Sequence, residues 1–249
     1  MMAQAETQRS VFYRCLTVLG LTLSLTGCNA TGFIENPDDQ LDLTEVAKAE
    51  IEDGKCDDAI VSISKVGQKT SATYQTLGWA HLCAAGAKLD NVLGAVLSYN
   101  SSSAELFMIG DLAKSLAPTS AGRQSHIDSA IDAFNNMDRG DQKQAQLTIG
   151  YLIKASEVIA QRSRDGGNIS RDDIAPSSTC TSNSACPSTD AITDVQIGQV
   201  LTAVTAASNA ASASSTLGTA AELARALLGV LNQSTRVAQR YEIRTRLVR

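Results

Sequence analysis

Histidine and cysteine are the residues of this 249-residue sequence best suited to catalysis or metal binding, and both are scarce. The two histidines, His81 and His126, stand at unrelated spacings, and no two cysteines form a C-x-x-C pair. The chain also lacks G-x-S-x-G, H-E-x-x-H and phosphate-binding glycine motifs. The sequence therefore predicts no catalytic residue, no metal site and no cofactor, and favours a protein that is not an enzyme.

One loop partly follows the pattern of a calcium-binding EF-hand loop. Residues 162–173 end on Asp173, an acid at the last ligand position. Calcium also requires oxygen ligands at the first, third and fifth positions. Those positions hold Arg162, Arg164 and Gly166. We interpret the segment as an ordinary loop.

The first 27 residues have the layout of a secretory signal peptide. Arg9 and Arg14 precede an apolar stretch that runs from Leu16 to Thr26. The stretch is shorter than the roughly 20 apolar residues that a membrane-spanning helix needs. We therefore expect residues 1–27 to be removed during export.

The leader ends in the sequence LTGC, residues 25–28, which resembles the lipobox of bacterial lipoproteins. In that family the matching cysteine carries a thioether-linked diacylglycerol and becomes the acylated N-terminus. The resemblance thus implies lipidation of Cys28, with palmitate as a label for it, and attachment to a membrane through the lipid. Asn29 is not the aspartate that commonly retains such proteins at the inner membrane, so the outer membrane is favoured, with the body facing the periplasm.

Four cysteines remain in the body, an even number that is typical of disulfides in an exported chain. Cys56 and Cys83 lie at ends of two expected antiparallel helices, so the two ends should meet. Cys180 and Cys186 enclose five residues of polar loop. Of three possible connectivities, we expect Cys56 to pair with Cys83 and Cys180 with Cys186.

The composition predicts an all-α fold. Aromatic residues make up 4% of the chain and alanine and leucine are abundant, which favours helices with small contact residues over strands. The net charge of −5 gives no nucleic-acid signature. We expect antiparallel helical pairs that continue as a helical bundle or a short solenoid.

The chain divides by composition after the signal peptide. We expect a tether over residues 28–41, helices over 42–164, a Ser/Thr/Pro-rich loop closed by a disulfide over 165–188, and C-terminal helices over 189–249. Among the helix boundaries, Gly54, Gly67 and Gly86 are predicted to end the first three helices, Ser71 to cap the third, and Asp90 to begin a fourth.

The first helical pairs resemble tetratricopeptide repeats, a family with small residues where neighbouring helices approach most closely. The residues that match the motif are Tyr74, Leu77, Gly78 and Ala80, and, more loosely in the preceding unit, Ala47, Gly54, Ala59 and Ile63. The spacing from Ala47 to Gly78 is 31 residues rather than the usual 34, and no proline closes either unit. A plain helical bundle remains the alternative.

The C-terminal segment is basic. We expect the helix over residues 219–233 to run into this segment, and its arginines to lie mostly on solvated helix faces. A secondary interpretation is contact with phospholipid headgroups or an acidic partner. The arginines are Arg236, Arg240, Arg244, Arg246 and Arg249.

These features predict a membrane-anchored periplasmic lipoprotein whose helical pairs bind an envelope protein, as a scaffold or an envelope-assembly accessory. The resemblance to the repeat family implies a groove for a peptide or helix, with Tyr74 and Gln75 as exposed candidate contacts. The alternative is a ligand-binding accessory lipoprotein of a solute transporter. A continuous pocket lined by leucine, isoleucine and valine would favour the accessory, and a polar groove would favour the scaffold.

Overall fold

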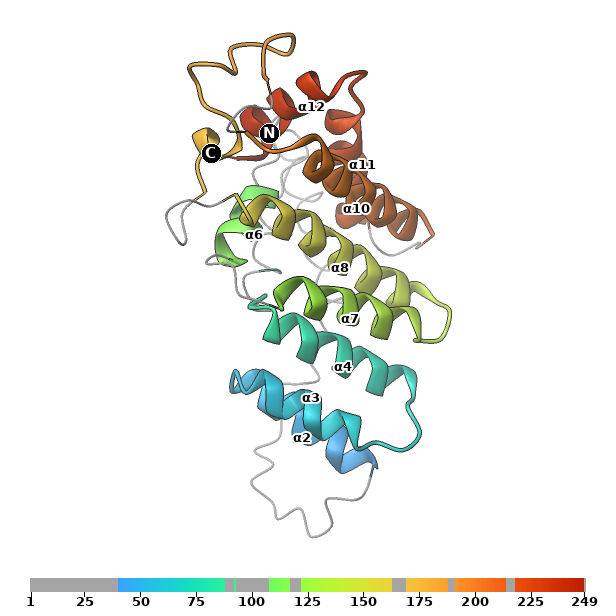
Figure 1. Ribbon diagram of the computed structural model, residues 1–249. Helices are drawn as coiled ribbons and strands as arrows, with labels where there is room; N and C mark the ends of the chain where they lie inside the picture. Colours follow the sequence, from blue (N-terminus) through green and yellow to red (C-terminus); the bar gives the residue numbers. More distant parts are fainter. Residues whose placement is uncertain are drawn as a thin grey trace, which may run out of the picture. The chain divides into compact units, whose positions relative to one another are not determined.

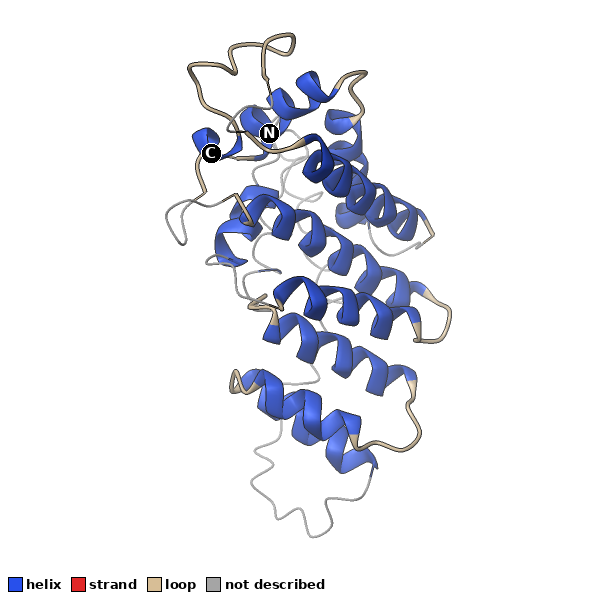
Figure 2. Ribbon diagram, in the orientation of Figure 1, coloured by secondary structure: helices blue, strands red, loops and turns tan. Residues whose placement is uncertain are grey.

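A computed structural model describes residues 40–87, 92, 108–116, 122–162, 169–187, 191–213 and 218–248. In these ranges the regular secondary structure is helical, apart from an isolated bridge between Ser182 and Ala185 (Figure 2). The prediction of an all-α fold is therefore confirmed. The signal peptide, Cys28 and the residues predicted to begin a helix at Asp90 lie outside the described ranges.

Contacts group residues 38–249 into one compact unit, and its helices follow one another along the chain. The helices are α2 (Gln40–Glu52), α3 (Cys56–Ser64), α4 (Ser71–Ala84), α6 (Met108–Leu116), α7 (Arg123–Asn135), α8 (Asp141–Ala160), α9 (Arg171–Ile174), α10 (Asp194–Ser212), α11 (Gly218–Leu231), α12 (Arg236–Glu242) and the π-turn η2 (Ile243–Leu247).

Most helices pack against their neighbours in the sequence (Figure 1). Helices α2, α3 and α4 contact one another, α4 packs on α7, and α7 packs on α8. Helix α8 then packs on α10, which packs on α11, while α6 lies against α8. The buried residues form one main core that extends from α4 to the C-terminal helices, and a separate smaller core between α2, α3 and α4.

The N-terminal helix boundaries follow local backbone chemistry. Gly54 and Gly86 adopt positive φ after α2 and α4, as a glycine that ends a helix does. Thr70, not the predicted Ser71, caps α4, because its hydroxyl accepts from the N–H of Thr73 while the Ser71 hydroxyl donates to Asp138. Helix α3 ends at Ser64, before the predicted Gly67, since the next two N–H groups bond three residues back and tighten the last turn.

Three helices meet around Phe134 of α7, which is fully buried. A Cβ on Gly78 of α4 would lie 2.2 Å from the Phe134 ring, and one on Gly150 of α8 would lie 3.6 Å from it. Trp79 packs its edge toward the same ring, with centroids 6.3 Å apart. The glycines thus allow α4, α7 and α8 to close around one aromatic side chain.

Two expectations for the C-terminal part were wrong. The predicted loop contains a one-turn helix, α9, begun by a capping box in which the Asp173 carboxylate accepts from the N–H and hydroxyl of Ser170. Helix α11 does not continue into the basic segment. It ends at Leu231, and α12 begins anew because the Thr235 hydroxyl accepts from the N–H of Ala238.

Candidate functional site

A cleft of about 470 Å³ lies between α7, α8 and α10, with the first residue of α12 at one side. Small residues of α10, including Gly198, Ala203 and Ala206, line one wall and leave the space open. The Arg236 guanidinium passes over α10 at Gly198, where a Cβ would lie 3.6 Å from it. The full lining is Gln124, Ile127, Tyr151, Lys154, Glu157, Val158, Gln161, Val195, Gly198, Gln199, Leu201, Thr202, Ala203, Ala206 and Arg236.

The interior and the rim of the cleft differ in character. Ile127, Val158 and Ala203 are buried and give it an apolar interior. The exposed side chains are carboxamides, a hydroxyl and the guanidinium of Arg236, joined by an apolar side chain, Val195, which is 72% exposed at the start of α10. The carboxamides and hydroxyl belong to Gln124, Gln161, Gln199 and Thr202.

Charged side chains of the cleft have partners within the fold. Lys154 donates to Asp128 at 2.6 Å, and Arg236 donates to the carboxamide of Gln239 at 2.7 Å. Glu157 is 3% exposed and accepts from Arg123 at 3.3 Å. Burial raises the pKa of Glu157, and the charge of Arg123 opposes this rise.

The lining is suited to binding. Among the described residues around the cleft there is no histidine, cysteine or serine. Carboxamides both donate and accept hydrogen bonds, which is the requirement for pairing with the backbone of an extended peptide. The apolar interior is of a size to take a side chain.

The residues predicted to bind a partner are not exposed. Tyr74 is half-buried against the main core. Gln75 is also half-buried, and its carboxamide accepts from Gln142 at 2.7 Å, which joins α4 to α8. Motif position alone predicted their exposure, but α7 packs on α4 and the Gln142 side chain of α8 reaches Gln75.

The cleft itself had no specific signal in the sequence. Ile197, Val200 and Val204 form the buried stripe of α10, and Val195 falls off that stripe. A single apolar residue on the exposed side of a helix is common and does not by itself mark a binding site. The partners of Val195 in the cleft come from other helices, so their nearness could not be predicted from α10 alone.

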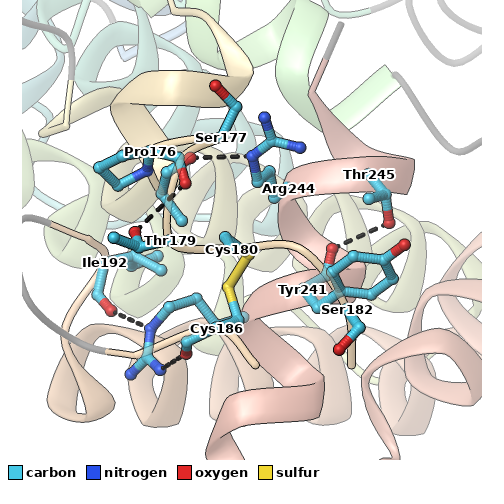
Figure 3. Close-up of a disulfide and its surroundings, with 12 residues drawn as sticks. Pro176, Ser177, Thr179, Cys180, Ser182, Cys186, Ile192, Tyr241, Arg244 and Thr245 are labelled. Carbon is cyan, nitrogen blue, oxygen red and sulfur yellow. Dashed lines mark hydrogen bonds between the residues drawn. A yellow bond between two sulfur atoms is a disulfide. The ribbon is translucent and has the colours of Figure 1, made fainter. Parts of the chain in front are cut away.

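The body cysteines pair as the sequence predicted. Cys56 at the start of α3 is joined to Cys83 near the end of α4, with Cα atoms 5.4 Å apart. Cys180 is joined to Cys186 in the loop before α10 (Figure 3). The first disulfide links two helices, and the second closes a short loop.

Two arginines of the basic C-terminal segment, Arg240 and Arg244, pack inward, contrary to the expectation of solvated helix faces, whereas Arg236 and Arg246 are exposed as expected. Arg240 is 1% exposed; its Nε donates to the carbonyl of Ile192 at 2.8 Å and its Nη1 to that of Cys186 at 2.6 Å. Its Nη2 donates to the Asp194 carboxylate. Arg244 donates to the carbonyl of Ala175 at 2.8 Å. Arginines spaced four residues apart share one face of a helix. The sequence does not show that this face packs against the loop before α10.

Comparisons with protein-family models, with curated proteins and with solved structures found no match to the chain. In the described part of the chain, each helix is too short or too polar to span a membrane.

Proposed function

We propose that this protein is a bacterial outer-membrane lipoprotein, anchored through Cys28, whose periplasmic helical body is a protein-interaction scaffold or an envelope-assembly accessory. The stacked helix pairs are, in this proposal, relatives of the tetratricopeptide repeats. The partner is an envelope protein that binds in the cleft between α7, α8 and α10. The observation that carries the proposal is this cleft, with its carboxamide rim and exposed Val195.

Export is supported by the two disulfides. Such bonds form and persist in oxidising compartments, and they are rare in the cytosol. Both lie in the part of the chain that follows the LTGC sequence, where a lipoprotein's body would be. The acyl anchor is a separate expectation that rests on the resemblance of residues 25–28 to the lipobox.

Lipidation is tested by metabolic labelling with an alkyne analogue of palmitate. The wild-type chain should be labelled, and the variant Cys28→Ser should not. The variant Cys56→Ser serves as the control, since it removes a body cysteine and should keep the label. Equal labelling of wild type and Cys28→Ser would contradict the anchor.

Partner binding is tested by a photo-crosslinking amino acid placed at Gln199 in the native envelope. Asn209 gives a matched control, because it is an exposed carboxamide on the same helix outside the cleft lining. We expect a discrete protein adduct, identified by mass spectrometry, from position 199 and not from 209. Equal adducts at both positions, or none at 199, would contradict the cleft as the partner site.

The second candidate function is a ligand-binding accessory lipoprotein of a solute transporter. The cleft volume favours it, since small-molecule sites commonly measure about 300–1,000 Å³. The mixed lining favours the scaffold, because carboxamides and charged groups accompany the apolar residues. Native mass spectrometry of the purified protein distinguishes the two, since the accessory should retain a small molecule that Ala203→Trp excludes.

A further inference from the structure

The chain has only two histidines, and the fold brings them into contact. His81 lies in the last turn of α4 and His126 in the first turn of α7, 45 residues later. Their Nδ1 atoms are 3.2 Å apart, and their ring centroids are 5.5 Å apart. Both side chains are half-buried.

The spacing of the two nitrogens fits one metal ion. Zinc binds histidine nitrogen at about 2.0–2.1 Å. Two such bonds to atoms 3.2 Å apart would meet at an angle of about 100°, close to tetrahedral. Little movement of either helix would be needed, since α4 packs directly on α7 and the Cys56–Cys83 disulfide fixes the same end of α4.

The required protonation states are also accessible. In the metal-free pair, one Nδ1–H donates to the other Nδ1. A metal ion needs both Nδ1 lone pairs, so the donor ring must move its proton to Nε2, a tautomer change with no net proton release.

We propose that His81 and His126 bind a divalent transition-metal ion, such as Zn²⁺ or Cu²⁺, through their Nδ1 atoms. Imidazole nitrogen suits both ions. Within the described residues no third histidine, cysteine or carboxylate joins the pair, so water fills the other coordination positions. Arg123, one turn before His126, has its charge balanced by Glu157.

Isothermal titration of the full-length protein with Zn²⁺ tests the site, with a purification that uses no polyhistidine tag. We expect one saturable site, weakened at least about tenfold by His126→Asn and by His81→Asn, because loss of even an outer-shell partner commonly weakens a metal about 10–100-fold. Asp58→Asn, which removes an exposed acid of α3, should bind like the wild type. Absence of saturable binding, or equal affinity in both histidine variants and the wild type, would overturn the proposal.

Electron paramagnetic resonance with Cu²⁺ examines the wild-type protein directly, so it does not depend on the folding of a variant. Coordination by both rings should give hyperfine coupling to two equivalent nitrogens. A spectrum with coupling to one ring or to none would overturn the paired site. A folded His126→Asn, checked by circular dichroism, should retain coupling to one nitrogen.

Discussion

The two disulfides lie in regions that are stabilised in different ways. Cys56–Cys83 joins α3 to α4, whose buried faces meet through Ala59, Ile63 and Ala80. Cys180–Cys186 lies in irregular chain, where a small apolar cluster is supplemented by the guanidinium of Arg240. The first region would keep much of its packing without its disulfide, whereas the second depends on polar contacts to its backbone.

The difference follows from where backbone hydrogen bonds are made. A helix pairs its own N–H and C=O groups, so helices need only apolar faces to pack. A buried loop leaves carbonyls that another segment must satisfy. Arg240 supplies donors to Cys186, Ile192 and Asp194 from one planar group. One residue of α12 thereby orders the loop and the start of α10.

The largest effect should come from Arg240→Met. The substitution keeps the bulk of the side chain but leaves two buried carbonyls and a carboxylate without their donor, so we expect a loss of about 3–5 kcal/mol in the free energy of unfolding. Urea denaturation of the oxidised protein measures it. Arg246→Met is the control, since that arginine is partly exposed and pairs only with Glu242, and it should change stability by at most about 0.5 kcal/mol. Similar losses in both variants would contradict the role of Arg240 in holding the loop and the start of α10.

Removal of each disulfide compares the two regions directly. The chain-entropy model gives about 3.5 kcal/mol for Cys56–Cys83, with a sequence separation of 27, and about 2 kcal/mol for Cys180–Cys186, with a separation of 6. Paired serine variants should therefore rank in that order in urea denaturation. The reverse order would show that the Cys180–Cys186 disulfide stabilises the fold by more than its chain-entropy effect, because it also orders the carbonyl that Arg240 binds.

Two glycine substitutions should differ in sign within the helices. Gly78→Ala brings a methyl group against the Phe134 ring, and the overlap should outweigh the gain in helix propensity, with a net loss of about 1–2 kcal/mol. Gly229→Ala in α11 meets nothing within 4 Å and should gain about 0.5–1 kcal/mol. Thermal denaturation measures both. If Phe134→Leu fails to recover part of the Gly78→Ala loss, the steric explanation is wrong.

The sequence predicts what depends on local pattern. The positions of the helices could be predicted from composition and capping residues, and Gly54 and Gly86 end helices as expected. The disulfide between Cys56 and Cys83 followed from the antiparallel pair. These features need only neighbouring residues, so one chain segment contains the information that fixes them.

The sequence fails where contacts join distant segments. The burial of Arg240, the meeting of His81 with His126, and the cleft at Gln199 each need side chains from helices far apart in the chain. Local pattern cannot show which helices become neighbours. The same limit explains why Tyr74 was expected to be exposed, since α7 lies more than 40 residues further along the chain.

The smallest expected effect is a difference in pH response between two carboxylates, Glu157 in α8 and Asp172 in α9. Burial raises the pKa of Glu157 above its ordinary 4.5, so the folded state takes up a proton there more readily than the unfolded chain. The wild type should therefore gain stability relative to Glu157→Gln as the pH falls from 7 through the raised pKa toward 4.5. Arg244 lowers the pKa of Asp172 below its ordinary 3.8, so stability from that contact is present above 3.8 and lost on further acidification.

Urea denaturation of the wild type, Glu157→Gln and Asp172→Asn between pH 7 and pH 3 separates the two responses. The difference between the wild type and Glu157→Gln should shift in favour of the wild type on acidification. The difference between the wild type and Asp172→Asn should stay constant down to about pH 4 and then shrink. Burial and an arginine partner shift a carboxyl pKa in opposite directions. If both differences moved in the same direction over the same pH range, the opposite pKa shifts assigned to Glu157 and Asp172 would be wrong.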